Sequence, residues 1–349
     1  MSRETLEWLN SNTLIGYTAQ RGTAWHYRAG ATNHFDGPVP LEEVRKILGW
    51  EPLVLPHTYE FAGEVRTSNR INVLRPDTGD LLGVFQHGYT PHPYPEWLVS
   101  KVEVLLGDQL GIGSAGMLRN GAVAWVSVEV PETVTVPSVG EAFRPSLLAT
   151  TSFDGSLATT YKRVATRVVC DNTLNIGLGE HTPTVRVKHT RDSLGRLDVI
   201  TARQALGIVF QMADEFTHTI EALCASTVTD RQWDQFLLGH MGERPEENKG
   251  GAQTKWDNRR DGLTDMYRTD ARVAPWTNTA WGVLQAVNTY QHHETGLRGT
   301  LRGLRNMDLT VTGDYDLLDS KTLSTLETVL GGRVLLPARA PRTVVAMAA

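Results

Sequence analysis

The hydrophobic and polar positions of the chain change period several times, so the sequence predicts a mixture of helices and strands. Residues 41–48 have apolar positions at helical spacing, with two glutamates in the first turn and two basic residues in the last. This charge order suits the helix dipole. Residues 50–86 have the two-residue period of strands instead. Within them, Pro76-Asp77-Thr78-Gly79 predicts a hairpin turn.

The middle of the chain has the strongest hairpin signals, followed by the longest helical pattern. Asn120-Gly121 and Asp154-Gly155 each stand between apolar runs and predict tight turns. Residues 157–169 and 185–189 alternate between basic and apolar side chains, as strands do. Residues 203–224 then have an apolar stripe at helical spacing that is wide enough to cover a sheet.

The remaining C-terminal pattern is mainly helical, with predicted helices over 229–238, 255–268 and 279–292 and one more ending at Leu330. We therefore expect an α+β fold, in which antiparallel hairpins form a sheet covered by the long helix. The expected boundaries are an α+β core domain at 1–240, a polar loop at 241–256, a helical C-terminal region at 257–332 and a tail at 333–349.

Composition narrows the class of protein. With 40% hydrophobic and 21% charged residues the chain has an ordinary globular composition. No apolar run approaches the roughly 20 residues that cross a bilayer, and the polar N-terminus differs from a signal peptide. The two cysteines, Cys170 and Cys224, form no paired motif, which favours a reducing compartment. The histidines of the proline-rich segment 87–97 lack a metal-ligand spacing and are expected in a solvated loop, so no metal or cofactor is predicted.

The uneven distribution of charge along the chain indicates more about function than the overall composition does. The formal net charge is −5, yet residues 151–206 carry eight Lys and Arg against five Asp and Glu. On the first basic strand, alternation places Tyr161, Arg163 and Arg167 on one face, and Lys162 with Val164 and Val168 on the other. On the second, Arg186 and Lys188 are expected to point outward. The two strands together predict a positive sheet face that carries an aromatic ring.

A second basic group occurs further along, where Arg298, Arg302 and Arg305 share one face if the segment is helical. Three glycines in this segment weaken the helix, so a functional and a structural interpretation are both open.

Several short motifs, in their order along the chain, resemble the phage- and plasmid-like proteins of the domain-of-unknown-function 932 family. The resemblance covers residues 20–295, and its motifs are TAWH, LGW, SFDGS, VVCDNTLNIGL, VKHT, ARQALG and NTAWGVLQAVNTY. It implies a gene carried by bacteriophages, plasmids or integrated elements, and therefore a bacterial host cytoplasm. The family supplies no established reaction and no catalytic residues, and residues after about 300 depart from its pattern.

The first functional hypothesis is a protein that binds single-stranded DNA in phage recombination or replication, such as an annealing protein. Positive charge combined with an aromatic platform is how strand-tolerant binding works. Strands followed by a long helix are also similar to the β-β-β-α core of ring-forming single-strand annealing proteins. A homo-oligomeric ring would concentrate a modest basic patch from each subunit. The competing interpretation is that Arg and Lys simply solvate the outer face of a sheet.

The second hypothesis is an enzyme with Cys170 as nucleophile and His189 or His181 as base. A basic strand beside the cysteine and a following helix start would lower the pKa of its thiol. Free cysteines are usually buried, however, so a small core residue is the simpler interpretation, and the chain is expected not to be an enzyme. A host-interaction protein without catalysis is a third possibility.

Overall fold

The computed structural model describes residues 6–22, 24, 27, 29–106, 110–129, 133–136, 138–167, 173–174, 185–187, 189, 216–246, 250–294 and 300–332. The chain forms two compact units. Unit 1 comprises Met1–Glu132, Pro145–Arg163 and Pro183–Phe210, and unit 2 comprises Thr133–Arg144, Val164–Thr182 and Gln211–Ala349. This division differs from the predicted boundary near residue 240, because each unit is assembled from segments far apart in sequence.

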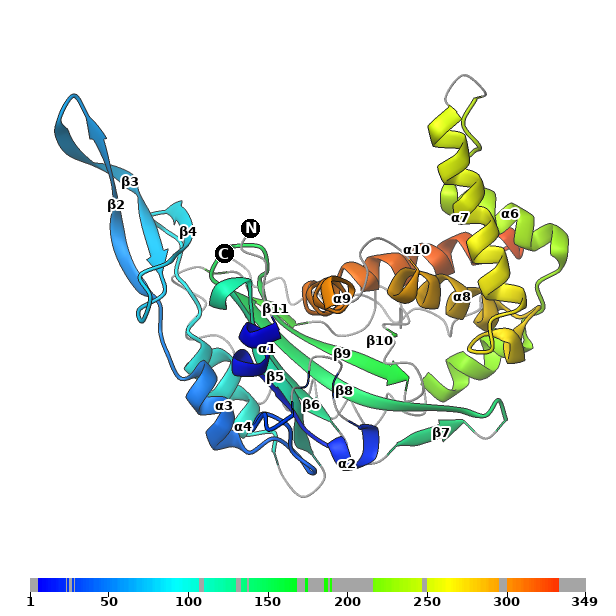
Figure 1. Cartoon of the computed structure of the whole chain (residues 1–349), viewed down its shortest axis with the longest axis horizontal. Coiled ribbons are helices and arrows are strands. Elements are labelled where there is room, and N and C mark those ends of the chain that lie inside the picture. Colours follow the sequence, from blue (N-terminus) through cyan, green and yellow to red (C-terminus); the bar gives the residue numbers. More distant parts are fainter. Residues whose placement is uncertain are drawn as a thin grey trace. The chain divides into compact units, whose positions relative to one another are not determined.

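The larger sheet is antiparallel, and its eight described strands have the order β1-β5-β6-β8-β9-β10, with β7 paired to β8 and β11 paired to β9. Figure 1 shows β5, β6, β8 and β9 side by side as its long strands. The bounds are β1 Thr13–Ile15, β5 Gly111–Leu118, β6 Val123–Glu129, β7 Val134–Val136, β8 Glu141–Ser152, β9 Thr159–Arg167, β10 Thr173–Leu174 and β11 Val185–Val187.

The tight turns form where the sequence predicts them. Asn120 and Gly121, between β5 and β6, have φ of 56° and 87°, and Gly155, between β8 and β9, has φ of 75°. Positive φ is costly for most residues but open to glycine and tolerated by asparagine, which explains the choice of residues. The Asp154 carboxylate accepts from the Ser156 backbone N–H at 2.8 Å and closes the second turn.

A separate three-stranded antiparallel sheet belongs to unit 1 and has the order β2-β3-β4. Its strands are β2 Leu53–Phe61, β3 Glu64–Leu74 and β4 Leu81–Gln86. The predicted turn at Pro76-Asp77-Thr78-Gly79 joins β3 to β4. Figure 1 shows the β2–β3 hairpin continuing well past the end of β4.

The helices of unit 1 cover part of the larger sheet. They are α1 Leu6–Asn12, α2 Thr18–Arg21, α3 Leu41–Leu48 and α4 Lys101–Glu103, with a π-helical turn η1 at Pro95–Ser100 and a 3-10 turn η2 at Arg119–Gly121. The predicted helix 41–48 is confirmed, and it buries Val44 and Leu48 in a core that also contains Leu98 and Val126. The π-helical turn η1 leads directly into α4.

Unit 2 is mainly helical. Its elements are α6 Asp230–Met241, α7 Gly250–Arg268, a 3-10 turn η4 at Ala274–Trp276, α8 Ala280–His293, α9 Thr300–Thr312 and α10 Asp314–Val329, and residues 216–225 are also helical. Thr229 caps α6 with a reciprocal bond to Gln232. Trp233, Trp281 and Leu326 meet in its core.

The α+β fold class is confirmed by the antiparallel sheets and the helical C-terminal region. One boundary differs from the prediction. Residues 250–256 are helical, although the polar sequence predicts a loop there. Residues 203–215 of the predicted long helix lie outside the described part of the chain, so the β-β-β-α core stays a prediction. No described helix is both long and apolar enough to cross a membrane.

Candidate functional site

The two basic strands of the predicted interface are neighbours in the larger sheet. β11 pairs antiparallel with β9, with Val185 opposite Tyr161 and Arg186 opposite Thr160. Arg163 and Arg167 also lie in β9. The structure thus confirms that both stretches contain strands, and it places those strands side by side.

Tyr161 is buried, although the sequence predicts it on an open face of the sheet. Its side chain is 1% exposed, and its hydroxyl donates to the backbone oxygen of Trp97. Burial raises the pKa of Tyr161 above its ordinary value. The expectation of an exposed stacking ring is wrong, because η1 covers this side of β9.

Lys162 points to the opposite side of β9 from Tyr161 and is also buried, with 7% of its surface exposed. Both sides of β9 are thus covered at this point of the strand, whereas a half-buried sheet would leave one side open. Tyr161 and Lys162 are in this structure core residues of unit 1, which leaves the arginines as the candidate phosphate contacts.

The other predicted basic residues are divided between the units. Arg163 and Arg186 belong to unit 1, and Arg167 belongs to unit 2. Arg302 and Arg305 are half-buried on α9, which confirms helix there. Burial lowers the pKa of His293 and of His292, and the charges of Arg302 and Arg305 respectively lower it further. Lys188, Arg298, Cys170 and His181 lie outside the described residues.

His189 belongs to a column of stacked rings in unit 1 that the sequence did not predict. His92 lies between His189 and Trp97, with ring centroids 4.1 Å and 3.9 Å away. On the other side, Tyr89 stacks on His189 at 5.2 Å and on Phe85 at 3.8 Å. These five residues form the histidine stack. The expectation of solvated histidines in segment 87–97 is wrong for His92, which is fully buried.

Hydroxyl groups occupy the polar edge of the histidine stack. Thr159 Oγ1 lies 2.6 Å from His92 Nδ1 and 2.7 Å from Thr151 Oγ1. His189 Nδ1 lies 2.8 Å from the Tyr89 hydroxyl, and its Nε2 lies 3.3 Å from Thr159 Oγ1. A neutral His189 that donates from Nδ1 and accepts at Nε2 satisfies this network.

Burial decides what the stack can do chemically. It lowers the pKa of His92 to about 3, helped by the neighbouring His189, and the pKa of His189 to about 4. A general base works best when its pKa lies near the working pH, and both nitrogens of His189 already have partners. The stack therefore fits a structural role, although the predicted pairing of His189 with Cys170 stays untested.

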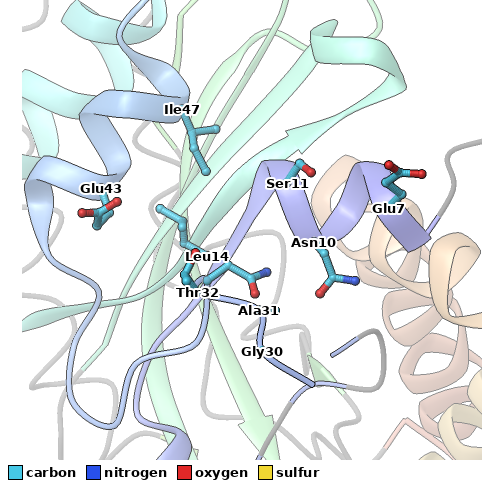
Figure 2. Close-up of a pocket in the computed structure, with 10 residues that line it drawn as sticks. Glu7, Asn10, Ser11, Leu14, Gly30, Ala31, Thr32, Glu43 and Ile47 are labelled. Atoms are coloured by element: carbon cyan, nitrogen blue, oxygen red, sulfur yellow. The ribbon is translucent and has the colours of Figure 1, made fainter. Parts of the chain in front are cut away.

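A pocket of about 420 Å³ lies between α1, the segment around residues 30–33 and α3. Figure 2 shows Glu7 and Glu43 on opposite sides of it, with Asn10, Ser11 and Thr32 between them. The charged residues that line it are both carboxylates. Such a pocket repels phosphate groups, so it is no candidate for the predicted nucleic-acid contact.

Unit 2 contains a buried polar seam between α8 and α10. Asp319 is fully buried and accepts a 3.4 Å hydrogen bond from Asn288 Nδ2, and the His292 ring stacks on Tyr315 at 4.1 Å. Asp319 therefore links α10 to α8. Within the described residues, no group of three His, Cys, Asp or Glu could hold a metal ion.

One exposed surface was missed by the sequence interpretation. The distal part of the β2–β3 hairpin, residues 57–70, carries Tyr59 at 47% exposure and Phe61 at 58% exposure. The signal was present at Ala62-Gly63, where φ of 55° and 78° form the two-residue turn. Alanine rarely adopts the left-handed backbone conformation. Rules based on the usual turn residues therefore do not predict this turn.

The comparisons with known proteins identify a family and no function. A family model described as a domain of unknown function, DUF932, matches residues 81–312, about two thirds of the chain. The match starts later than the predicted resemblance and reaches the end of α9. The expectation that the chain departs from the family pattern after about residue 300 is therefore wrong for residues 300–312. No curated protein and no solved structure matches the chain.

Proposed function

This chain belongs to the DUF932 family, whose description assigns no activity, and we propose that it binds single-stranded nucleic acid. The observation that carries this proposal is the antiparallel pairing of β9 with β11. It brings two strands from the chain's net-positive stretch together in one sheet. Arg163, Arg167 and Arg186 are the proposed phosphate contacts, and annealing of complementary DNA strands is the proposed activity.

The physical basis is electrostatic. Arginine forms two parallel hydrogen bonds to a phosphate and keeps its charge at any physiological pH. Each phosphate that is neutralised releases counterions from the strand, so affinity falls as salt rises. The rest of the chain is net negative, which favours contact through this stretch alone. Such an activity belongs in the cytoplasm of a bacterial host that carries a phage or plasmid.

The double substitution Arg163→Ala/Arg167→Ala tests the proposal. Binding of a fluorescent single-stranded oligonucleotide is measured across a salt series. The slope of log affinity against log salt is expected to become shallower by about 1.4, because each phosphate contact on a single strand contributes about 0.7.

Arg45→Ala/Lys46→Ala is the matched control, since it removes the same two positive charges from the exposed surface of α3. It should leave the slope unchanged. Equal slopes for the wild-type protein and the β9 variant, with circular dichroism showing intact folding, would contradict the proposal.

A further inference from the structure

Exposed apolar side chains concentrate on the small sheet of unit 1. In the described part of the chain, seven of the eleven large hydrophobic residues that are exposed lie on β2, β3 or β4: Leu53, Val54, Leu55, Tyr59, Phe61, Val65 and Leu81. Isolated exposed apolar residues are ordinary on a protein surface, but a contiguous group marks an interaction site.

One face of the distal hairpin, residues 57–70, has an ordered arrangement of aromatic and charged groups. Tyr59 is opposite Arg66 and Phe61 is opposite Glu64, so all four side chains share one face. The Arg66 guanidinium lies 5.0 Å from the Phe61 ring centroid, and its Nη2 lies 3.3 Å from the Glu64 carboxylate. We call these four residues the hairpin face.

The base of the hairpin is held in place. Arg75, directly after β3, is 8% exposed and bonds both oxygens of Asp77, at 2.7 and 2.9 Å. It also donates to the Asn120 backbone oxygen at 3.2 Å, and its guanidinium lies over the ring of Trp50. A fixed base presents the hairpin face without the entropy cost of ordering a loose loop on binding.

Charge decides what kind of partner fits. The distal hairpin has Glu60 and Glu64 against Arg66 and Arg70, so it has no net formal charge when His57 is neutral. A polyanion would gain little from such a surface. Tyrosine, phenylalanine and arginine are the side chains enriched at protein interfaces. A face with one acidic and one basic residue is also self-complementary, because a two-fold axis can set each against the other.

We propose that the hairpin face packs against the hairpin face of a second copy of this chain, across a two-fold axis. Arg66 of each copy then meets Glu64 of the other, around a centre formed by Tyr59 and Phe61. Packing by faces fits better than pairing along β2, because Pro56 removes a backbone donor from that strand. This inference goes beyond the proposed function and does not depend on it, since no nucleic acid is involved.

The mass of the protein in solution gives the first test. The wild-type protein is expected at twice the 38.6 kDa chain mass or a multiple of that. Phe61→Asp should halve this mass. Two controls should leave it unchanged: Val65→Asp on the opposite face of the same hairpin, and Leu317→Asp, which is 70% exposed on α10.

Charge reversal gives the second test. Arg66→Glu alone and Glu64→Arg alone should each lower the mass, because two like charges then face each other across the axis. Mixing the two single variants should restore association, since one hairpin face is then wholly acidic and the other wholly basic. Restoration in the mixture separates a contact between copies from the contact within one hairpin.

Four results would overturn the inference. The first three are a monomeric wild-type protein, dissociation by Val65→Asp but not by Phe61→Asp, and a mixture of charge variants that stays apart. Loss of oligonucleotide binding in Phe61→Asp at unchanged mass would also overturn it and would assign the hairpin face to nucleic acid instead.

Discussion

Buried histidines make the stability of this protein fall at acidic pH. His92 and His189 stay neutral in the histidine stack, with pKa values of about 3 and about 4, whereas an unfolded histidine titrates near 6.5. Between these values the unfolded chain binds protons that the folded protein excludes. The contribution of these two histidines to the free energy of unfolding is therefore greatest above about pH 6.5 and falls as the pH drops below that value.

Replacing His92 with glutamine should flatten this dependence. The slope of the free energy of unfolding between about pH 6 and pH 5 is expected to fall by about 1 kcal/mol per pH unit, because one buried imidazole no longer titrates in the unfolded chain. Urea unfolding at several pH values measures the slope. His218→Gln is the control, since His218 is 77% exposed. An unchanged slope in His92→Gln would show that His92 takes up protons in the folded state.

At the level of single elements, one glycine decides how closely α8 can approach its neighbours. A Cβ atom on Gly282 would lie 2.0 Å from the backbone oxygen of Trp276. A backbone atom cannot move aside as the end of a flexible side chain can. Gly282→Ala should therefore lower the free energy of unfolding by about 1–3 kcal/mol, although alanine is the better helix former.

Gly251 supplies the comparison, because it is also helical but has no atom within 4 Å of its Cβ position. Gly251→Ala should be neutral or stabilising by up to about 1 kcal/mol. Urea unfolding of both variants measures the difference. If Gly282→Ala were as stable as Gly251→Ala, the close approach of α8 to Trp276 would not exist.

Elements governed by local chemistry could be predicted, and those governed by distant contacts could not. The turns at Asn120-Gly121 and Asp154-Gly155 and the helix at 41–48 follow from their own residues. The burial of Tyr161 does not, because it depends on η1, some 60 residues earlier in the chain. His92 is hidden for the same reason, since Thr159 and His189 reach it only in the folded chain.

The candidate site was predicted at the level of strands rather than side chains. The alternation of basic and apolar positions predicted the two strands. The exposure of their basic face, however, was inferred on the assumption that one side of the sheet is open. At Tyr161 and Lys162 both sides of β9 are covered. The hairpin face was missed because its turn residue, Ala62, is an unusual one for positive φ.

At the scale of the whole molecule, self-association affects how the basic stretch binds a polyanion. An acidic chain with one basic stretch binds a polyanion weakly as a single copy. Joining copies lets the basic stretches of two chains bind one strand, so assembly increases avidity. Single-strand affinity should therefore be lower for Phe61→Asp than for Val65→Asp, and its salt slope should be shallower, because fewer phosphates are neutralised in each complex.

The most direct measurement is the affinity of the purified protein for a fluorescent single-stranded oligonucleotide, compared with its duplex, across a salt series. We expect binding of the single strand at about 50 mM salt, a steady loss of affinity as salt rises, and weaker binding of the duplex. No single-strand binding at low salt, or an affinity that does not change with salt, would contradict it.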